Sequence, residues 1–142
     1  MDNTVIELPF GIIEIANKCV IHTANEGVDI GHEELEIIGR IVKENTEGDI
    51  SYISNQINDY SISAVHLAIA LQNLPTIKHL AFVYYKQSRH TALQSVLRLL
   101  PENMLIKTFD NLADAMQWVE KCNAKSDSYD SLTSSLAGEG SF

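Results

Sequence analysis

Two polar clusters in this sequence contain residue types that bind or carry charged groups. The first, Asp59-Tyr60-Ser61, places a hydroxyl between a β-prone segment and an apolar helical segment. A phosphate on Ser61 would lie near the free N–H groups of a helix N-terminus, where the helix dipole favours negative charge. Serine at such a junction is also a common helix cap, and Ser63 offers the same chemistry. We therefore favour capping by Ser61 or Ser63, with phosphorylation of Ser61 as the alternative.

The second cluster follows a strongly β-prone segment and contains Lys86, Ser88, Arg89 and His90, with no acidic residue beside them. Cationic side chains, a hydroxyl and helix N-terminal amides together suit a phosphate or a carboxylate. Arg89 is the strongest candidate ligand, because its guanidinium presents a fork of donors. A solvated basic turn explains the same residues, and we favour that simpler reading.

Catalytic and metal-binding signatures are absent from the sequence. The histidines have no His-x-x-x-His spacing and no Cys-x-x-Cys motif accompanies them: His22, His32, His66, His79 and His90. Ser61 and His66, with Asp59, have the residue types of a hydrolase triad, but a five-residue spacing does not bring the first two onto one helix face. No glycine-rich nucleotide loop is present. We expect no catalytic residue, no metal and no cofactor.

Composition favours one globular domain. The chain has 142 residues, of which 45% are hydrophobic, and a formal net charge of -9, which disfavours nucleic acid and anionic membranes as partners. The N-terminal segment lacks the pattern of a secretory signal, and no apolar run is long enough for a membrane span. Cys19 and Cys122 have no metal-ligand spacing and should stay reduced. We expect a soluble cytoplasmic protein, whose oligomeric state the sequence leaves open.

Hydrophobic periodicity predicts the elements that position the two clusters. Strands are predicted at 5–8, 11–16, 18–24, 50–57, 78–85 and 104–109. Helices are predicted from Asp29 or Gly31 to Gly48, over 63–74 and over 89–100. A last helix is capped by Asp110, and its apolar face is formed by Leu112, Ala115, Met116 and Val119, with Trp118 beside them.

Strand and helix alternate three times after the first strands, which predicts an α/β fold. The sheet should be mixed, with an N-terminal strand pair followed by parallel strands and with helices packed on it. The turns that follow parallel strands open at one rim of a sheet, where ligands of such folds bind. The predicted binding rim comprises Asp59, Tyr60, Ser61, Lys86, Ser88, Arg89, His90 and Asp110. Residues 1–124 form the predicted domain, and 125–142 a flexible serine-rich tail.

The second half of the chain resembles a known family. The segments SISAVHLAIAL, IKHLAFVYY, TALQSVLRLL and LIKTFDNLADAMQWVEK are similar to those of STAS-domain proteins, especially the small bacterial STAS/SEC14-like members. The most characteristic part is an aromatic residue and an acid followed by a helix with alanines and a tryptophan: Phe109, Asp110, Ala113, Ala115 and Trp118. The resemblance covers roughly Gly11 to Lys121 and implies a single STAS-like α/β domain.

STAS domains include the anti-sigma-factor antagonists, which bind a kinase and are switched by phosphorylation of the second serine in Asp-Ser-Ser-Gly. Here Asp59 and Ser61 match that motif, whereas Tyr60 and Ile62 replace its first serine and its glycine. The resemblance implies a non-catalytic regulatory protein that binds another protein, with a phosphorylation link as an open question. Two alternatives remain: a SEC14-like carrier of a lipid or another apolar small molecule, and an enzyme with an unrecognised site.

Overall fold

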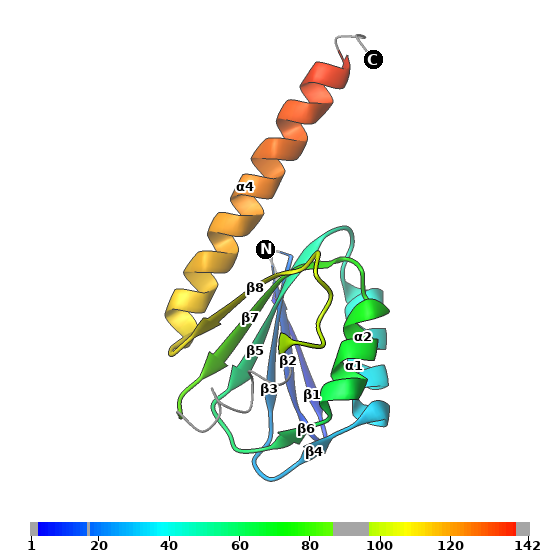
Figure 1. Ribbon diagram of the computed structural model, residues 1–142, viewed down its shortest axis with the longest axis vertical. Coiled ribbons are helices and arrows are strands. Elements are labelled where there is room, and N and C mark those ends of the chain that lie inside the picture. The colour runs from blue at the N-terminus through cyan, green and yellow to red at the C-terminus, as the bar shows by residue number, and fades with distance from the viewer. Residues whose placement is uncertain (1–2, 17, 87–96, 139–142) are drawn as a thin grey trace.

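The computed structural model describes residues 3–16, 18–86 and 97–138 (Figure 1). A six-stranded sheet has the order β1-β2-β3-β5-β7-β8. Its strands are β1 Thr4–Leu8, β2 Gly11–Ala16, β3 Cys19–Ala24, β5 Ile50–Gln56, β7 Ile77–Tyr84 and β8 Leu105–Phe109. The first three strands pair antiparallel, and β3, β5, β7 and β8 pair parallel. The predicted mixed α/β architecture is confirmed.

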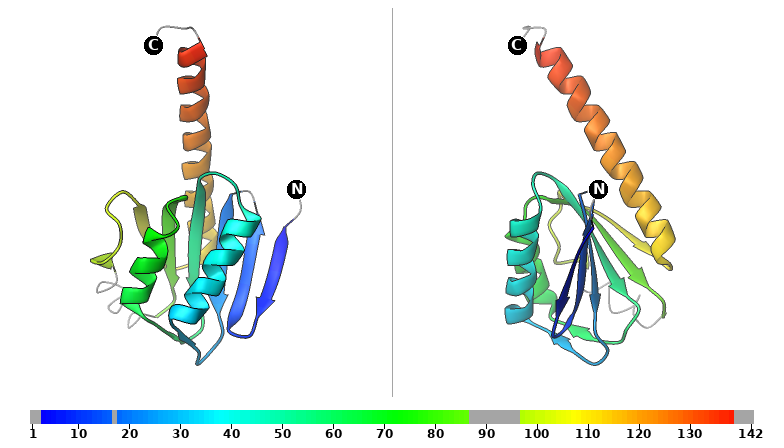
Figure 2. Two further views of the ribbon diagram at one scale, coloured as in Figure 1. Left: turned by 90° about the vertical axis from the view of Figure 1, so that its right-hand side faces the viewer. Right: turned by 180° about the vertical axis from the view of Figure 1, so that it is seen from behind.

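Helices cover both faces of the sheet (Figure 2). Helices α1, His32–Asn45, and α2, Ala64–Gln72, lie side by side on one face, and α4, Leu112–Gly138, lies on the other. The larger core fills the space between the sheet and α1 and α2, and a smaller core lies beneath α4. All seven residues of the central strand β5 are therefore buried. The predicted helix 89–100 falls largely outside the described residues.

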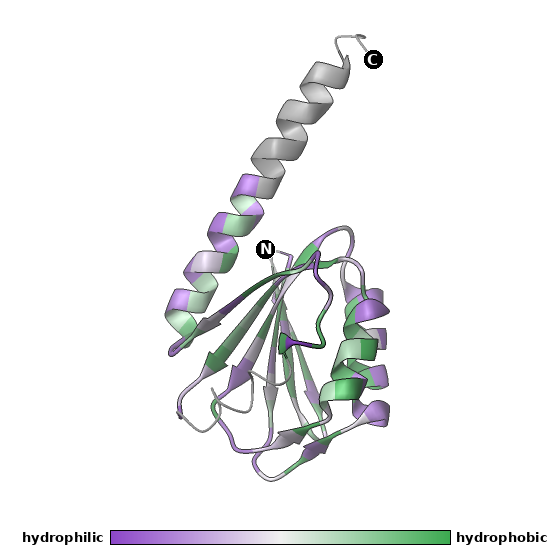
Figure 3. Cartoon of the chain, in the orientation of Figure 1, coloured by the Kyte–Doolittle hydropathy of each residue, from purple (hydrophilic) through white to green (hydrophobic). Residues whose placement is uncertain are grey.

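Helix α1 begins as its sequence predicts. Gly31 is the N-cap, and its N–H donates to the carboxylate of Glu34 three residues later at 2.8 Å. Leu35, Ile38 and Val42 recur at helical spacing and are buried against the sheet. Polar residues cover the outer side of this helix (Figure 3). Of the two predicted starts, Gly31 is the observed one.

Two very short strands connect the beginnings of α1 and α2. Strand β4, Asp29–Ile30, pairs in parallel with β6, Ser61–Ile62. The N–H of Ser63 donates to the carbonyl of Ile30 at 3.1 Å, and the Ser63 hydroxyl caps α2. The first turns of both helices are thereby held together beside the end of β5.

Helix α4 differs from the prediction at its start and along its apolar face. Asn111 and not Asp110 is the cap, because the Asn111 side-chain oxygen accepts the N–H of Asp114 at 2.9 Å. Ala115 and Val119 are buried, but Met116 is 42% exposed. Met116 lies at the side of the stripe, where it borders a groove lined by residues of β1, β2 and β3 instead of packing under the helix.

The same helix continues to Gly138, past the predicted start of a tail near Lys125 (Figure 1). The helix thus includes 125–138, a segment that the sequence analysis assigned to the tail. Figure 1 shows this C-terminal part projecting beyond the sheet. The end of α4 could not be predicted from the local sequence, because serine lowers helix propensity but does not break a helix as proline does. The division into a domain and a flexible tail stays a prediction.

Candidate functional site

The loops that follow β3, β5 and β7 meet at one rim of the sheet, as expected for parallel strands. The ammonium of Lys86, after β7, lies 2.7 Å from the carboxylate of Asp59, after β5. Both side chains are more than half exposed, at 60% and 53%. Residues of two predicted clusters thus form one exposed ion pair on this rim.

Further hydrogen bonds connect the rim to the loop after β3. The carboxylate of Glu26 accepts the N–H of Asp59 at 2.7 Å, and the Asp59 carbonyl accepts the N–H of Gly27 at 2.7 Å. The side-chain amide of Asn58 donates to the carbonyl of Ala24 at 2.9 Å. Sequence reasoning missed Glu26 and Asn58, although the parallel pairing of β3 with β5 would have pointed to both.

The remaining predicted rim residues have different positions. Tyr60 is 7% exposed and its hydroxyl lies 3.4 Å from that of Ser54, so it belongs to the core. Asp110 is exposed after β8 and accepts a hydrogen bond from Asn111 at 2.8 Å. Ser88, Arg89 and His90 lie outside the described residues. The described rim surface therefore consists of Glu26, Asp29, Asn58, Asp59, Ser61, Lys86 and Asp110.

Ser61 is exposed but does not cap α2. Its hydroxyl donates to the carboxylate of Asp29 on the paired strand, and its N–H donates to the carbonyl of Val28 at 3.0 Å. Ser63 is the cap, since its hydroxyl accepts the N–H of His66 at 3.3 Å. A phosphate on Ser61 would lie beside the carboxylate of Asp29. Two negative charges in such close contact repel each other.

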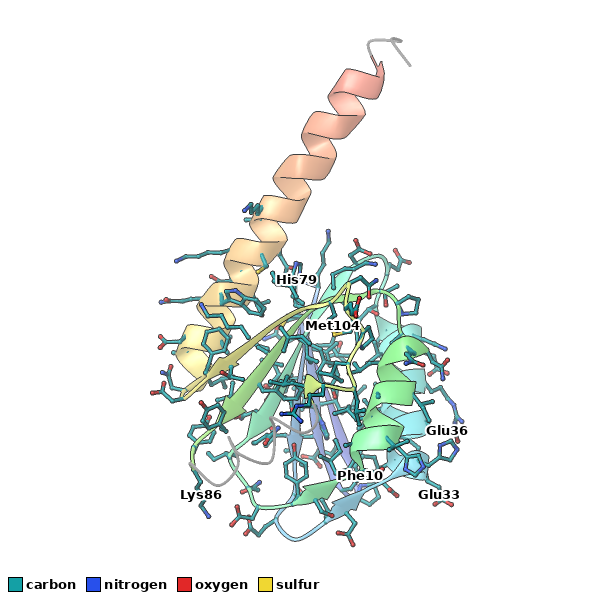
Figure 4. The ribbon with its side chains drawn as sticks, in the orientation of Figure 1. Phe10, Glu33, Glu36, His79, Lys86 and Met104 are labelled. Carbon is teal, nitrogen blue, oxygen red and sulfur yellow. The ribbon has the colours of Figure 1, made fainter. Side chains whose placement is uncertain are left out.

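A second polar group lies at the opposite end of β7, as the positions of His79 and Lys86 in Figure 4 show. The fully buried Ser51 hydroxyl donates to the Asn123 side chain at 3.0 Å and lies 3.1 Å from His79 Nδ1. The Ser51 hydroxyl uses its proton in the hydrogen bond to Asn123. In the hydrogen bond between Ser51 and His79, the donor must therefore be His79 Nδ1. His79 therefore does not act as a base toward Ser51. The group ties α4 to the sheet.

Burial controls the pKa values around this group. It lowers the pKa of His79, while the nearby Asp49 opposes that shift. Burial also raises the pKa of the Cys19 thiol to about 12, so this thiol is protonated at neutral pH and unreactive. No three His, Cys, Asp or Glu side chains come together as a metal site among the described residues.

The core between the sheet and helices α1 and α2 contains a cavity of about 40 Å³. Small-molecule pockets start at roughly 300 Å³, so this space is far too small for a lipid. Within the described ranges, no helix has the length and apolar character needed to cross a bilayer.

Comparison with known proteins supports the fold. No family model matches the chain, and no curated protein sequence matches it. The chain is similar to the crystal structure of an uncharacterized protein from the DUF3478 family with a SpoIIAA-like fold, from Shewanella loihica PV-4. The match has a TM-score of 0.51 and 15% identity, and it covers 83% of this chain and 92% of that chain. The chain therefore has a SpoIIAA-like fold, as the resemblance to STAS domains predicted.

Proposed function

We propose that this protein is a non-catalytic regulatory protein that binds a partner protein through the described rim surface. The observation that carries the proposal is the exposed ion pair between Lys86 and Asp59 at 2.7 Å, which joins two loops into one charged surface. A SpoIIAA-like fold is compatible with a role in regulatory protein interaction.

The character of the rim suits a macromolecule better than a small molecule. Asp59, Ser61 and Lys86 are exposed, and they line neither the cavity in the main core, nor the groove beside Met116, nor the pocket between α1 and α2. An exposed ion pair adds little to stability, but charges on an interface steer association and select partners. The acidic excess of this surface favours a partner with a basic contact region.

Phosphorylation of Ser61 would regulate such binding by disruption. The phosphate adds about two negative charges. It also replaces the hydroxyl proton through which Ser61 donates its hydrogen bond to the Asp29 carboxylate. Repulsion between phosphate and carboxylate would then separate β4 from β6, the two strands that hold the starts of α1 and α2 together. Regulation at this position would therefore act through the shape of the rim.

The test begins with recovery of a partner by cross-linking in native extract and mass spectrometry. The affinity of that partner is then measured for Lys86→Glu and for Arg40→Glu, which reverses an exposed charge on the outer side of α1. We expect Lys86→Glu to change the affinity at least tenfold and Arg40→Glu to leave it unchanged. Equal effects of the two reversals would refute the rim as the contact surface.

Amide chemical shifts of the labelled protein give an independent readout. Addition of the partner should perturb Glu26, Asn58, Asp59 and Lys86 first. Arg89→Ala tests the predicted rim residue that lies outside the described ranges. Perturbations confined to the outer sides of α1 and α2 would place the interface elsewhere.

A further inference from the structure

The small cavity in the main core is lined mostly by apolar side chains. Leu35, Leu71 and Leu80 are among its apolar lining residues. Its polar lining residues include His22 of β3 and Ser54 and Gln56 of β5. His22 and Ser54 are register partners in the parallel pair, so both side chains project from the same face of the sheet.

His22, which lines this cavity, has a ring nitrogen whose hydrogen-bonding capacity is not satisfied within the described part of the chain. Its side chain is only 3% exposed, and among the described residues its Nε2 atom has no hydrogen-bond partner. Burial lowers the pKa of His22 to about 4, so the imidazole is neutral at pH 7. Buried polar atoms are nearly always paired, so an unpaired nitrogen on a side chain that lines a cavity is a sign of a missing partner.

The neighbouring polar groups are loosely bonded. The Ser54 hydroxyl lies 3.4 Å from the Tyr60 hydroxyl and 3.4 Å from the Gln56 amide nitrogen. Strong hydrogen bonds between such groups are about 2.7 to 3.0 Å long. Ser54 can therefore form a better bond with a group placed in the cavity beside it.

We propose that this cavity binds the hydroxyl group of a small uncharged molecule, with His22 Nε2 as its main hydrogen-bond partner. A water needs about 10 to 15 Å³ of such space, so 40 Å³ admits about three non-hydrogen atoms. Among the residues that the structure describes, no charged side chain lines the cavity, and an ion would lose its hydration there without compensation. Water and a short alcohol share the required chemistry, and ethanol has the matching size. This site is separate from the rim proposed above.

The test is a titration of the uniformly ¹⁵N-labelled protein with ethanol, monitored at the His22 side-chain nitrogens. A ligand of three non-hydrogen atoms binds with a dissociation constant no tighter than about millimolar. We expect a saturable shift of His22 Nε2 and of the Ser54 amide in that range. Acetate, which is charged at neutral pH, should produce no saturable shift at either position.

Variants separate a specific site from a general solvent effect. His22→Leu removes the polar nitrogens at nearly the same volume, so it should lose ethanol binding and gain xenon binding, as dry apolar cavities do. His79→Leu changes a histidine on the opposite face of the sheet and should bind ethanol as the wild type does. If His22→Leu does not fold, Ser54→Ala serves in its place, with a predicted weakening of ethanol binding.

Two results would overturn the proposal. One is a His22 signal that responds to ethanol only linearly, well above the millimolar range, while water shows long-lived contacts with the imidazole. The cavity would then be a site for structural water only. The other is equal binding of ethanol and xenon to the wild type, which would show that His22 does not select a hydroxyl group.

Discussion

The hydroxyl of Ser63 accepts a hydrogen bond from the backbone N–H of His66 at 3.3 Å, and this contact marks the start of α2. Ser61, two residues earlier, belongs to β6 and bonds to Asp29 instead. The two serines therefore have separate roles, one in capping and one in pairing the short strands.

Replacing Ser63 with Ala should lower the free energy of unfolding by about 1 kcal/mol, because the backbone N–H of His66 loses its hydrogen-bond acceptor. Ser63→Asp should preserve stability, since Asp is an equally good cap. Ser61→Ala removes an exposed hydrogen bond and should cost less than Ser63→Ala. Urea denaturation measures all three variants, and a larger loss in Ser61→Ala would contradict the assignment of the cap.

The parts of the fold that sequence predicts are those with a local pattern. Ile13 and Ile15 alternate with exposed residues in β2, and the helical spacing of Leu35, Ile38 and Val42 predicts α1. Adjacent good caps such as Asp110 and Asn111 cannot be separated in this way, because both side chains offer the same acceptor.

Contacts between residues that are far apart in the sequence could not be predicted from local sequence patterns. Strands β4 and β6 have only two residues each, and Asp29 and Ser61 pair across 32 positions. The bond between Ser51 and Asn123 spans 72 positions. The proximity of Asp59 and Lys86 could be predicted from the sequence, because the loops that follow parallel strands lie at one edge of the sheet.

The bond between Ser51 and Asn123 predicts a measurable coupling between the sheet and α4. Ser51→Ala leaves the Asn123 oxygen and His79 Nδ1 without their shared partner, so it should cost about 1 to 3 kcal/mol. Asn123→Ala removes the hydrogen bond between Ser51 and Asn123 and leaves the one between Ser51 and His79. The double variant should cost less than the sum of the two single variants. Additive losses in a thermodynamic cycle would show that the two side chains do not interact.

Stability should fall in acid through His22. The ordinary pKa of histidine is 6.5, and burial lowers that of His22 to about 4. Only the unfolded chain therefore binds this proton between the two values, so stability is full above pH 6.5 and decreases as the pH falls to about 4. The contribution at its limit is about 3 kcal/mol. Urea midpoints of the wild type and His22→Leu between pH 7 and pH 4 measure it, and parallel curves would contradict the prediction.

The C-terminal part of α4 should contribute little to the stability of the domain. The residues by which α4 is held to the sheet include Ala115, Trp118, Val119 and Asn123, and all of them precede Lys125. Removal of residues 126–142 should therefore shift the thermal midpoint by less than about 5 °C. As a matched control, a chain that ends at Glu120 also loses Asn123, the partner of Ser51, and should melt clearly lower. Equal midpoints for the two truncated chains would show that the Asn123 contact does not stabilise the fold, and a large shift in the longer one would show that the C-terminal part of α4 docks.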